Sequence, residues 1–232
     1  PKKEAGDTMT KRQPLIWRIL FFAGFVFLQN LSTLALMADQ LLNTNLSQGA
    51  FALIIVVVFL VVMMYFIRVY QRQIQEYNPR GFGREFAMKG KIKWILLTVA
   101  AVYLFLILVT PLMPGEADNQ QNIDQLFRVH VLGITLYGAI LGPIIEELLY
   151  RGILMNYFWN ENDRKHDILA VVTSGLIFGL LHEPAISLYL LVYSVIGIFF
   201  GILYLKTKDI RCNMIAHILY NSITFIVMFT AL

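Results

Sequence analysis

Seven apolar stretches alternate with short polar segments along the chain. Most of them reach the length of about 20 residues that a helix needs to cross a bilayer. The longest contains Gly142-Pro143, where we predict a bend because proline removes a backbone hydrogen bond. The pattern predicts an all-α polytopic membrane bundle with about seven transmembrane helices, or eight, over residues 15–38, 50–70, 92–112, 127–159, 168–182, 186–205 and 214–232.

The composition supports a membrane protein and excludes several other classes. Charged residues make up 15% of the chain and the mean hydropathy is +0.65, whereas about 25% charged residues is usual in soluble domains. The net charge of +4 is carried by loops, so the lipid bilayer is expected as a partner and nucleic acid is not. A single cysteine, Cys212, excludes an internal disulfide and a cysteine-based metal cluster.

The loop charges predict the orientation of the spans. Residues 1–18 carry five basic and two acidic side chains, residues 68–93 carry seven and two, and residues 206–211 carry three and one. The intervening loops are mainly acidic. Since basic loops stay inside, we expect a multi-pass protein of the cell membrane with a cytoplasmic N-terminus. Residues 1–14 would form a cytoplasmic tail, in which residues 1–8 are expected to be a cloning remnant before a native start at Met9.

Two adjacent glutamates lie inside the longest apolar stretch, where an ionisable side chain is costly and usually functional. Glu147 and Arg151 are four residues apart in the acid-before-base order, which favours an ion pair on one helix face. Glu146 points about 100° away and has no such local partner. An unpaired carboxylate in an apolar setting is suited to take a proton from water and pass it on. The alternative is that both carboxylates only hold helices together.

Three further polar side chains lie in later apolar stretches: His182, which follows Phe178 by four residues, and His217 and Asn221, which are four apart. A lone histidine in a membrane helix is more often an interhelical hydrogen-bonding residue. Two histidines, an amide and an unpaired carboxylate together indicate chemistry. Histidine and asparagine can donate to an oxyanion, at about 2.7–4 kcal/mol per donor. A glutamate with two histidines could instead hold a zinc ion with one open position.

The predicted depths of these residues are similar. At about 1.5 Å per residue, Glu146, His217 and Asn221 lie roughly 9–16 Å from the cytoplasmic helix ends, and His182 lies at roughly 21 Å. We therefore predict that they meet in one site that opens toward the cytoplasmic half of the bilayer.

The order of these motifs on successive helices resembles the CPBP (Abi) family, which includes type II CAAX prenyl endopeptidases and bacteriocin-processing and self-immunity proteins. The resemblance covers about residues 129–229 and implies a catalytic four-helix core at 129–232, preceded by membrane helices and loops at 15–128. It implies Glu146 as the base that activates water, His182 as its assistant, and His217 and Asn221 as oxyanion-stabilising or metal-binding residues. Glu147 and Arg151 would support the site. The motifs are Glu146-Glu147-x-x-x-Arg151, Phe178-x-x-x-His182 and His217-x-x-x-Asn221.

The resulting hypothesis is an intramembrane endopeptidase, either of the glutamate type or dependent on a divalent metal such as zinc, that acts on a peptide or membrane-protein substrate. One alternative is a non-catalytic membrane scaffold or bacteriocin self-immunity protein that binds a peptide or protein partner. A proton or small-solute carrier ranks last, because such carriers usually contain inverted repeats and no internal repeat is evident.

Overall fold

The computed structural model describes residues 14–85, 87–115 and 117–230, and all regular elements among these residues are helices. The predicted tail at 1–14 therefore lies, except for Pro14, outside the described residues. The α-helices are α1 (Leu15–Ser32), α2 (Ala38–Leu41), α3 (Gln48–Glu76), α4 (Ile92–Val109), α5 (Asp118–Val129), α6 (Val131–Thr135), α7 (Gly142–Glu147), α8 (Met155–Phe158), α9 (Arg164–His182), α10 (Leu188–Thr207) and α11 (Ile210–Thr230).

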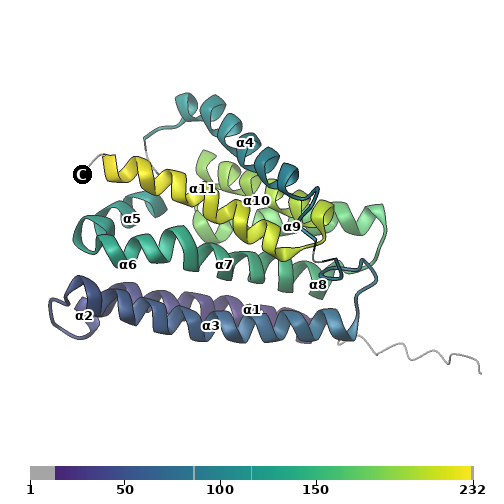
Figure 1. Cartoon of the computed structure of the whole chain (residues 1–232), viewed down its shortest axis with the longest axis horizontal. Coiled ribbons are helices and arrows are strands. Elements are labelled where there is room, and N and C mark those ends of the chain that lie inside the picture. Colours follow the sequence, from purple (N-terminus) through teal and green to yellow (C-terminus); the bar gives the residue numbers. More distant parts are fainter. Residues whose placement is uncertain (1–13, 86, 116, 231–232) are drawn as a thin grey trace, which may run out of the picture.

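A helical run from Val131 to Phe158 forms the middle of the bundle. It consists of α6, α7 and α8 joined by two π-helical segments, Leu136–Leu141 and Leu148–Leu154. The hairpin of α1 and α3 packs on one side of this central run, and α9, α10 and α11 pack on the other (Figure 1). The central run is thus enclosed by protein over most of its length, which makes it the natural carrier of a buried polar site.

The prediction of an all-α membrane bundle is confirmed. Six helical stretches of the described chain are long and apolar enough to cross a membrane: 15–41, 48–76, 92–112, 131–158, 188–207 and 210–230. The seventh long helix, α9, begins with the polar sequence Arg164-Lys165-His166-Asp167 and packs along α10 and the central run. The chain is therefore a multi-pass membrane protein. The division at residues 128 and 129 into two parts stays a prediction.

The pairing of α9 with α10 depends on glycine. A Cβ atom on Gly197 would lie 2.8 Å from the Cα of Gly175, and one on Gly179 would lie 2.9 Å from the backbone nitrogen of Ser194. Larger side chains at these positions would push the two backbones apart, as at other small-residue contacts between membrane helices. This close approach sets Phe178 and His182, at the end of α9, beside the first half of α10.

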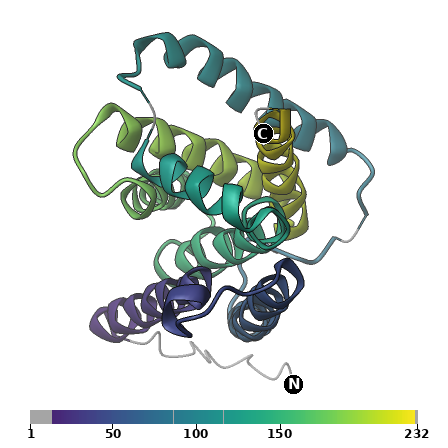
Figure 2. The ribbon, with the colours of Figure 1, turned by 90° about the vertical axis from the view of Figure 1, so that its left-hand side faces the viewer.

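The fourth predicted span begins later than expected, because residues 118–129 form a separate helix. In α5 the polar and apolar residues lie on different faces, and the helix ends at His130, whose φ and ψ of −128° and 63° are not helical. The acidic segment before the central run is therefore a surface helix. It crosses the end of the bundle that faces the viewer in Figure 2.

Candidate active site

The central run changes its hydrogen-bonding pattern on both sides of the two glutamates. One π-helical segment ends at Leu141, directly before Gly142-Pro143, and the other begins at Leu148, directly after Glu147. Proline has no N–H to donate, so an ordinary α-helical ladder is interrupted at Pro143. π-helical segments inside α-helices occur frequently at functional sites, because the inserted residue redirects the side chains that follow. The region predicted as a bend is therefore where the helix becomes irregular.

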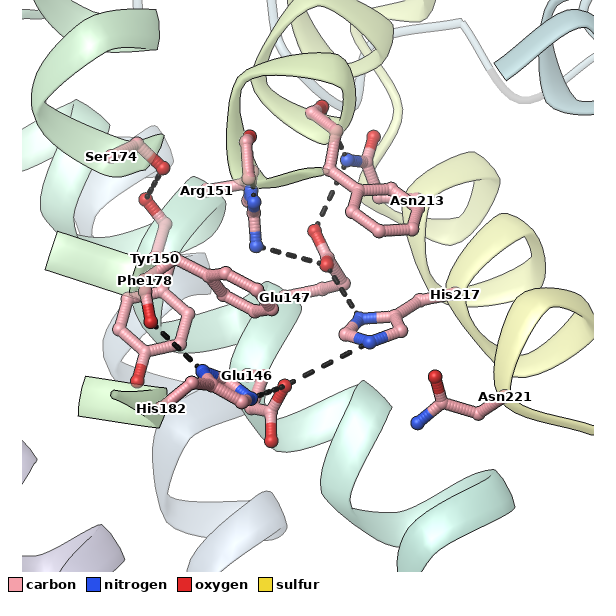
Figure 3. Close-up of polar contacts among 12 residues, drawn as sticks. Glu146, Glu147, Tyr150, Arg151, Ser174, Phe178, His182, Asn213, His217 and Asn221 are labelled. Carbon is pink, nitrogen blue, oxygen red and sulfur yellow. Dashed lines mark hydrogen bonds and ion pairs between the residues drawn. The ribbon is translucent and has the colours of Figure 1, made fainter. Parts of the chain in front are cut away.

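Glu147 is the centre of a fully buried polar network. Its Oε1 accepts a hydrogen bond from Arg151 Nη1 at 3.0 Å and one from His217 Nδ1 at 2.8 Å, and its Oε2 accepts one from Asn213 Nδ2 at 3.1 Å (Figure 3). The side chains of Glu147 and Arg151 are both 0% exposed. The predicted pairing of these two residues is thus present in the structure, and it ties the central run to α11.

Arg151 also contacts α9 and α10. Its Nη2 donates to the backbone oxygen of Gly197 at 2.8 Å, which links the central run to α10. The guanidinium carbon lies 4.9 Å from the ring centre of Phe178 and 5.5 Å from that of Phe200. Such cation–π contacts are strengthened by desolvation. A buried charge of this kind is tolerated only while its carboxylate partner is present.

The two histidines present the same ring nitrogen to the site. His217 Nδ1 faces the carboxylate of Glu147, and His182 Nδ1 lies 2.8 Å from the backbone oxygen of Phe178. Both partners are acceptors, so Nδ1 carries the hydrogen in each neutral ring and Nε2 carries the lone pair. This assignment follows from the hydrogen-bond partners. A neutral His217 therefore has no Nε2–H to give, and its predicted role as an oxyanion donor requires the imidazolium form.

Glu146 faces both of these lone pairs. Its Oε2 lies 3.7 Å from His182 Nε2 and 3.8 Å from His217 Nε2, beyond the range of a direct hydrogen bond. The side chain is 13% exposed, unlike the sealed Glu147. Glu146 thus lies at the wall of a cavity, whereas its neighbour is part of the structural network. The adjacent glutamates have different environments, as the 100° separation predicts.

The cavity beside Glu146 has a volume of about 120 Å³. Its lining comes from α5, the first half of the central run, the end of α9, the first half of α10 and the second half of α11. Besides Glu146, the lining residues are Asn119, Gln120, Ile123, Tyr137, Gly138, Gly142, Pro143, Phe178, His182, Tyr193, Ile196, His217, Tyr220, Asn221, Thr224, Phe225 and Met228. All candidate residues except Glu147 and Arg151 therefore line one cavity.

The position of this cavity corrects one expectation. A site opening toward the basic loops would extend from Glu146 toward Phe158 and from His217 toward Ile210. The lining instead extends toward Tyr137 on the central run and toward Met228 on α11, which are the opposite directions. The segments between the site and the basic loops are occupied by the buried network of Glu147. An estimate of depth from residue numbers alone does not show toward which end of the bundle the cavity extends.

Asn221 lines the cavity one helical turn beyond His217, apart from the network around Glu147 (Figure 3). Its Nδ2 donates to the backbone oxygen of Gly138 at 2.7 Å, which connects α11 to the π-helical segment of the central run. One N–H of the amide is used in this bond, and the second is left for a ligand in the cavity.

Two residues of the site were not predicted. Asn213, which binds Glu147 and the backbone oxygen of Phe200, lies four residues before His217, so the spacing of Asn213, His217 and Asn221 on one face of α11 could have indicated it. Tyr193 stacks on His182, with ring centres 5.0 Å apart and planes at 28°. No sequence pattern distinguishes it from the other tyrosines of the membrane helices.

Comparison with known proteins finds similarity over the second half of the chain. Residues 128–223 match the family model for Type II CAAX prenyl endopeptidase Rce1-like proteins. The chain is 32% identical over 113 residues to "Putative membrane peptidase YdiL" of Bacillus subtilis (strain 168), and these residues make up 49% of this chain and 43% of the relative.

Two further relatives cover similar parts of the chain. "Membrane-embedded CAAX protease MroQ" of Staphylococcus aureus (strain USA300) is 28% identical over 149 residues, which make up 61% of this chain and 59% of the relative. "UPF0177 protein YvdC" of Lactococcus lactis subsp. lactis (strain IL1403) is 28% identical over 105 residues, 45% of this chain and 38% of the relative. The chain thus spans about half the length of the relatives it matches. No solved structure matches it. Residues 128–223, the part of the chain that matches the Type II CAAX prenyl endopeptidase Rce1-like family model, contain the central run, α9, α10 and the cavity-lining part of α11 up to Asn221.

Proposed function

We propose that the chain is an intramembrane endopeptidase that hydrolyses a peptide bond with water activated by Glu146. The observation that carries this proposal is the convergence of three proton acceptors on one point: the two Nε2 lone pairs of His182 and His217 and one carboxylate oxygen of Glu146, 3.7 and 3.8 Å away. Polar gaps of this length are commonly bridged by water. The match of residues 128–223 to the Type II CAAX prenyl endopeptidase Rce1-like family model supports the same reaction class.

In the proposed reaction, Glu146 accepts a proton from water while the water oxygen bonds to the carbonyl carbon of the substrate. The same proton then passes to the amide nitrogen as the carbon–nitrogen bond breaks, which releases an amine and a carboxylic acid. The other hydrogen of the water would form a hydrogen bond to Nε2 of His182 or of His217, which would orient the water. Partial burial of Glu146 keeps bulk water away from the reacting oxygen.

The oxyanion of the tetrahedral intermediate needs hydrogen-bond donors to stabilise its charge. The free N–H of the Asn221 amide is one candidate, because its other N–H already binds Gly138. Glu147, Arg151 and Asn213 would act as positioning residues, since they fix the ring of His217 without lining the cavity.

A zinc-dependent reaction is the competing mechanism, because two imidazole nitrogens and one carboxylate are a donor set that zinc uses with an open position. Two ligands about 2.0–2.1 Å from a tetrahedral ion lie roughly 3.3 Å apart, which is shorter than the 3.7 and 3.8 Å found here. Among the described residues, no group of three or more His, Cys, Asp and Glu side chains is arranged to hold a metal. This geometry favours the glutamate mechanism.

The proposal is tested by comparing cells that produce the unaltered chain with cells that produce Glu146→Gln at equal membrane levels. New peptide termini in the membrane fraction, detected by mass spectrometry, are expected only with the unaltered chain. The same comparison identifies substrates without assuming prenylation. Identical termini in both samples, at matched folded yield, would refute a catalytic Glu146. Leu180→Ala, which changes an exposed side chain on α9, serves as the matched control and should retain the new termini.

A further inference from the structure

The helix bundle has one sealed end and one hollow end. The cavity occupies the end at which α5 and the last turns of α11 lie, whereas α8 and the beginning of α11 lie at the other end (Figure 1). The lining residues of α11 extend from His217 to Met228, which is about 16 Å along the helix axis. We therefore infer that peptide substrates reach Glu146 from the membrane face on which α5 lies, and that this face is non-cytoplasmic.

The opposite end is closed by the loop between α3 and α4. Phe82 is 2% exposed and stacks on Tyr204, with ring centres 4.3 Å apart. Its backbone N–H and C=O are both bonded to the side chain of Asn78, and the N–H of Gly83 donates to the backbone oxygen of Lys208 at 2.8 Å. A loop tied in this way covers the ends of the helices on this side of the bundle.

A second set of contacts closes the same end. Lys91 donates to Asp209 Oδ2 at 3.1 Å, and both residues are buried. Arg211 binds the same carboxylate at 2.7 Å. Burial alone would raise the pKa of the Asp209 carboxyl, but the hydrogen bonds from Arg211 and Lys91 outweigh it and hold that pKa below its usual value. The cluster therefore stays charged and bonded at neutral pH.

The sealed end is also the basic end. Residues 68–93, 159–167 and 206–211 at the sealed end together hold twelve basic and six acidic side chains, whereas the loops at the hollow end, 39–47, 113–130 and 183–187, hold one arginine against five acidic residues. By the positive-inside rule the sealed end faces the cytoplasm. The mouth of the cavity then faces the other compartment, beneath α5.

The lining near this mouth indicates what enters. Three amides, Asn119, Gln120 and Asn221, and the hydroxyl of Thr224 are placed around it, and the lining contains no lysine, arginine or aspartate. Amide side chains can bond to the N–H and C=O groups of an extended peptide. The expected substrate is thus an uncharged, extended peptide segment that is already exposed on the non-cytoplasmic side. This identity rests on the proposed peptidase function; the access route does not.

Cysteine accessibility tests the route. The natural Cys212 is 0% exposed and supplies an unreactive background in the folded protein. Single cysteines are introduced at Thr224 in the cavity, at exposed Asn122 on α5, and at exposed Lys89 in the loop at the sealed end. Intact cells are treated with a small membrane-impermeant thiosulfonate, and the remaining thiols are counted after denaturation by a mass-shifting maleimide.

Thr224→Cys and Asn122→Cys should lose at least about nine-tenths of their free thiol in intact cells, and Lys89→Cys should react only after permeabilisation. Reaction of Thr224→Cys only after permeabilisation, or no reaction of Asn122→Cys in intact cells, would overturn the inference. Met228→Cys repeats the cavity measurement if Thr224→Cys folds poorly. The measurement is made in parallel on the Glu146→Gln background, so failure of the peptidase proposal leaves the access result readable.

Discussion

Adjacent Glu146 and Glu147 differ by only one residue in the sequence, and this allows a matched pair of isosteric substitutions. Glu147→Gln removes the negative charge that compensates Arg151, whose side chain is 0% exposed. Removing one partner of a buried ion pair typically costs about 3–5 kcal/mol. With a shift of about 2–4 °C per kcal/mol for a chain of 150–250 residues, the expected loss of Tm is roughly 6–20 °C.

Glu146→Gln should behave differently. The carboxylate of Glu146 lies at a cavity, and the Nε2 atoms of His182 and His217 are 3.7 and 3.8 Å from its Oε2. Substitution removes no direct hydrogen bond to these partners, so the change in unfolding free energy should stay below about 1 kcal/mol. Hydrolytic activity should nevertheless be lost, because a glutamine cannot accept the proton from water. Stability and activity are thus predicted to separate between the two positions.

The chain contains its own reporter for this measurement. Cys212 is the single cysteine and is fully buried, so a maleimide fluorophore will react with it only when the bundle opens. Heating the detergent-solubilised variants in the presence of this dye gives Tm directly. Equal losses of Tm for the two variants, or an unchanged Tm for Glu147→Gln, would refute the division of roles. The double variant Glu147→Gln with Arg151→Met should regain part of the loss, because it removes the uncompensated charge.

Four further outcomes follow from the structure. His182→Ala should lower the cleavage rate at least about 100-fold with a Tm near that of the unaltered chain, and parallel loss of both would indicate a structural histidine. Tyr193→Leu, which removes the ring stacked on His182, should lower the rate less than His182→Ala does, as measured on the same substrate. Activity of the glutamate mechanism should survive chelation; loss on chelation with recovery on adding zinc would support the metal mechanism instead. The pKa of Asp209 is lowered from 3.8 in the folded protein, so its charged form stabilises the fold above pH 3.8 and this contribution is lost as the pH falls through the lower, folded pKa. Asp209→Asn should therefore have a lower Tm than the unaltered chain at neutral pH, and the difference should shrink in strong acid.

The sequence was sufficient for the parts of the fold that depend on local patterns. Apolar length predicted the membrane helices, and the four-residue spacing of Glu147 and Arg151 predicted their ion pair, which the structure contains. The start of the central run was missed because the polar segment 118–129 contains few strongly apolar residues, yet it forms the helix α5.

The sequence was also insufficient to predict the geometry of the candidate site. The titratable residues in apolar stretches could be selected from the sequence, since the cost of burying each one is visible there, and the structure places four of the six candidates at one cavity. Which ring nitrogen of His217 faces the cavity depends on Glu147, 70 residues earlier in the chain. The contact of Tyr193 with His182 depends on the close approach of α9 and α10 at glycines. Distances between helices, and therefore tautomers and cavity walls, are set by packing.

The buried network around Glu147 also sets the orientation of a residue that lines the cavity. Glu147 binds His217 at Nδ1 and leaves Nε2 facing the cavity, so the buried charges orient this imidazole without contacting its cavity-facing nitrogen. Arg151 makes this arrangement possible by keeping Glu147 an acceptor, and its bond to Gly197 ties the same group to α10. Rigid support from three helices is what a site needs to hold its groups within a few tenths of an ångström of a productive geometry. A membrane peptidase with a cavity at one end of its bundle would therefore be expected to concentrate its buried charges immediately behind that cavity, where Glu147 and Arg151 lie.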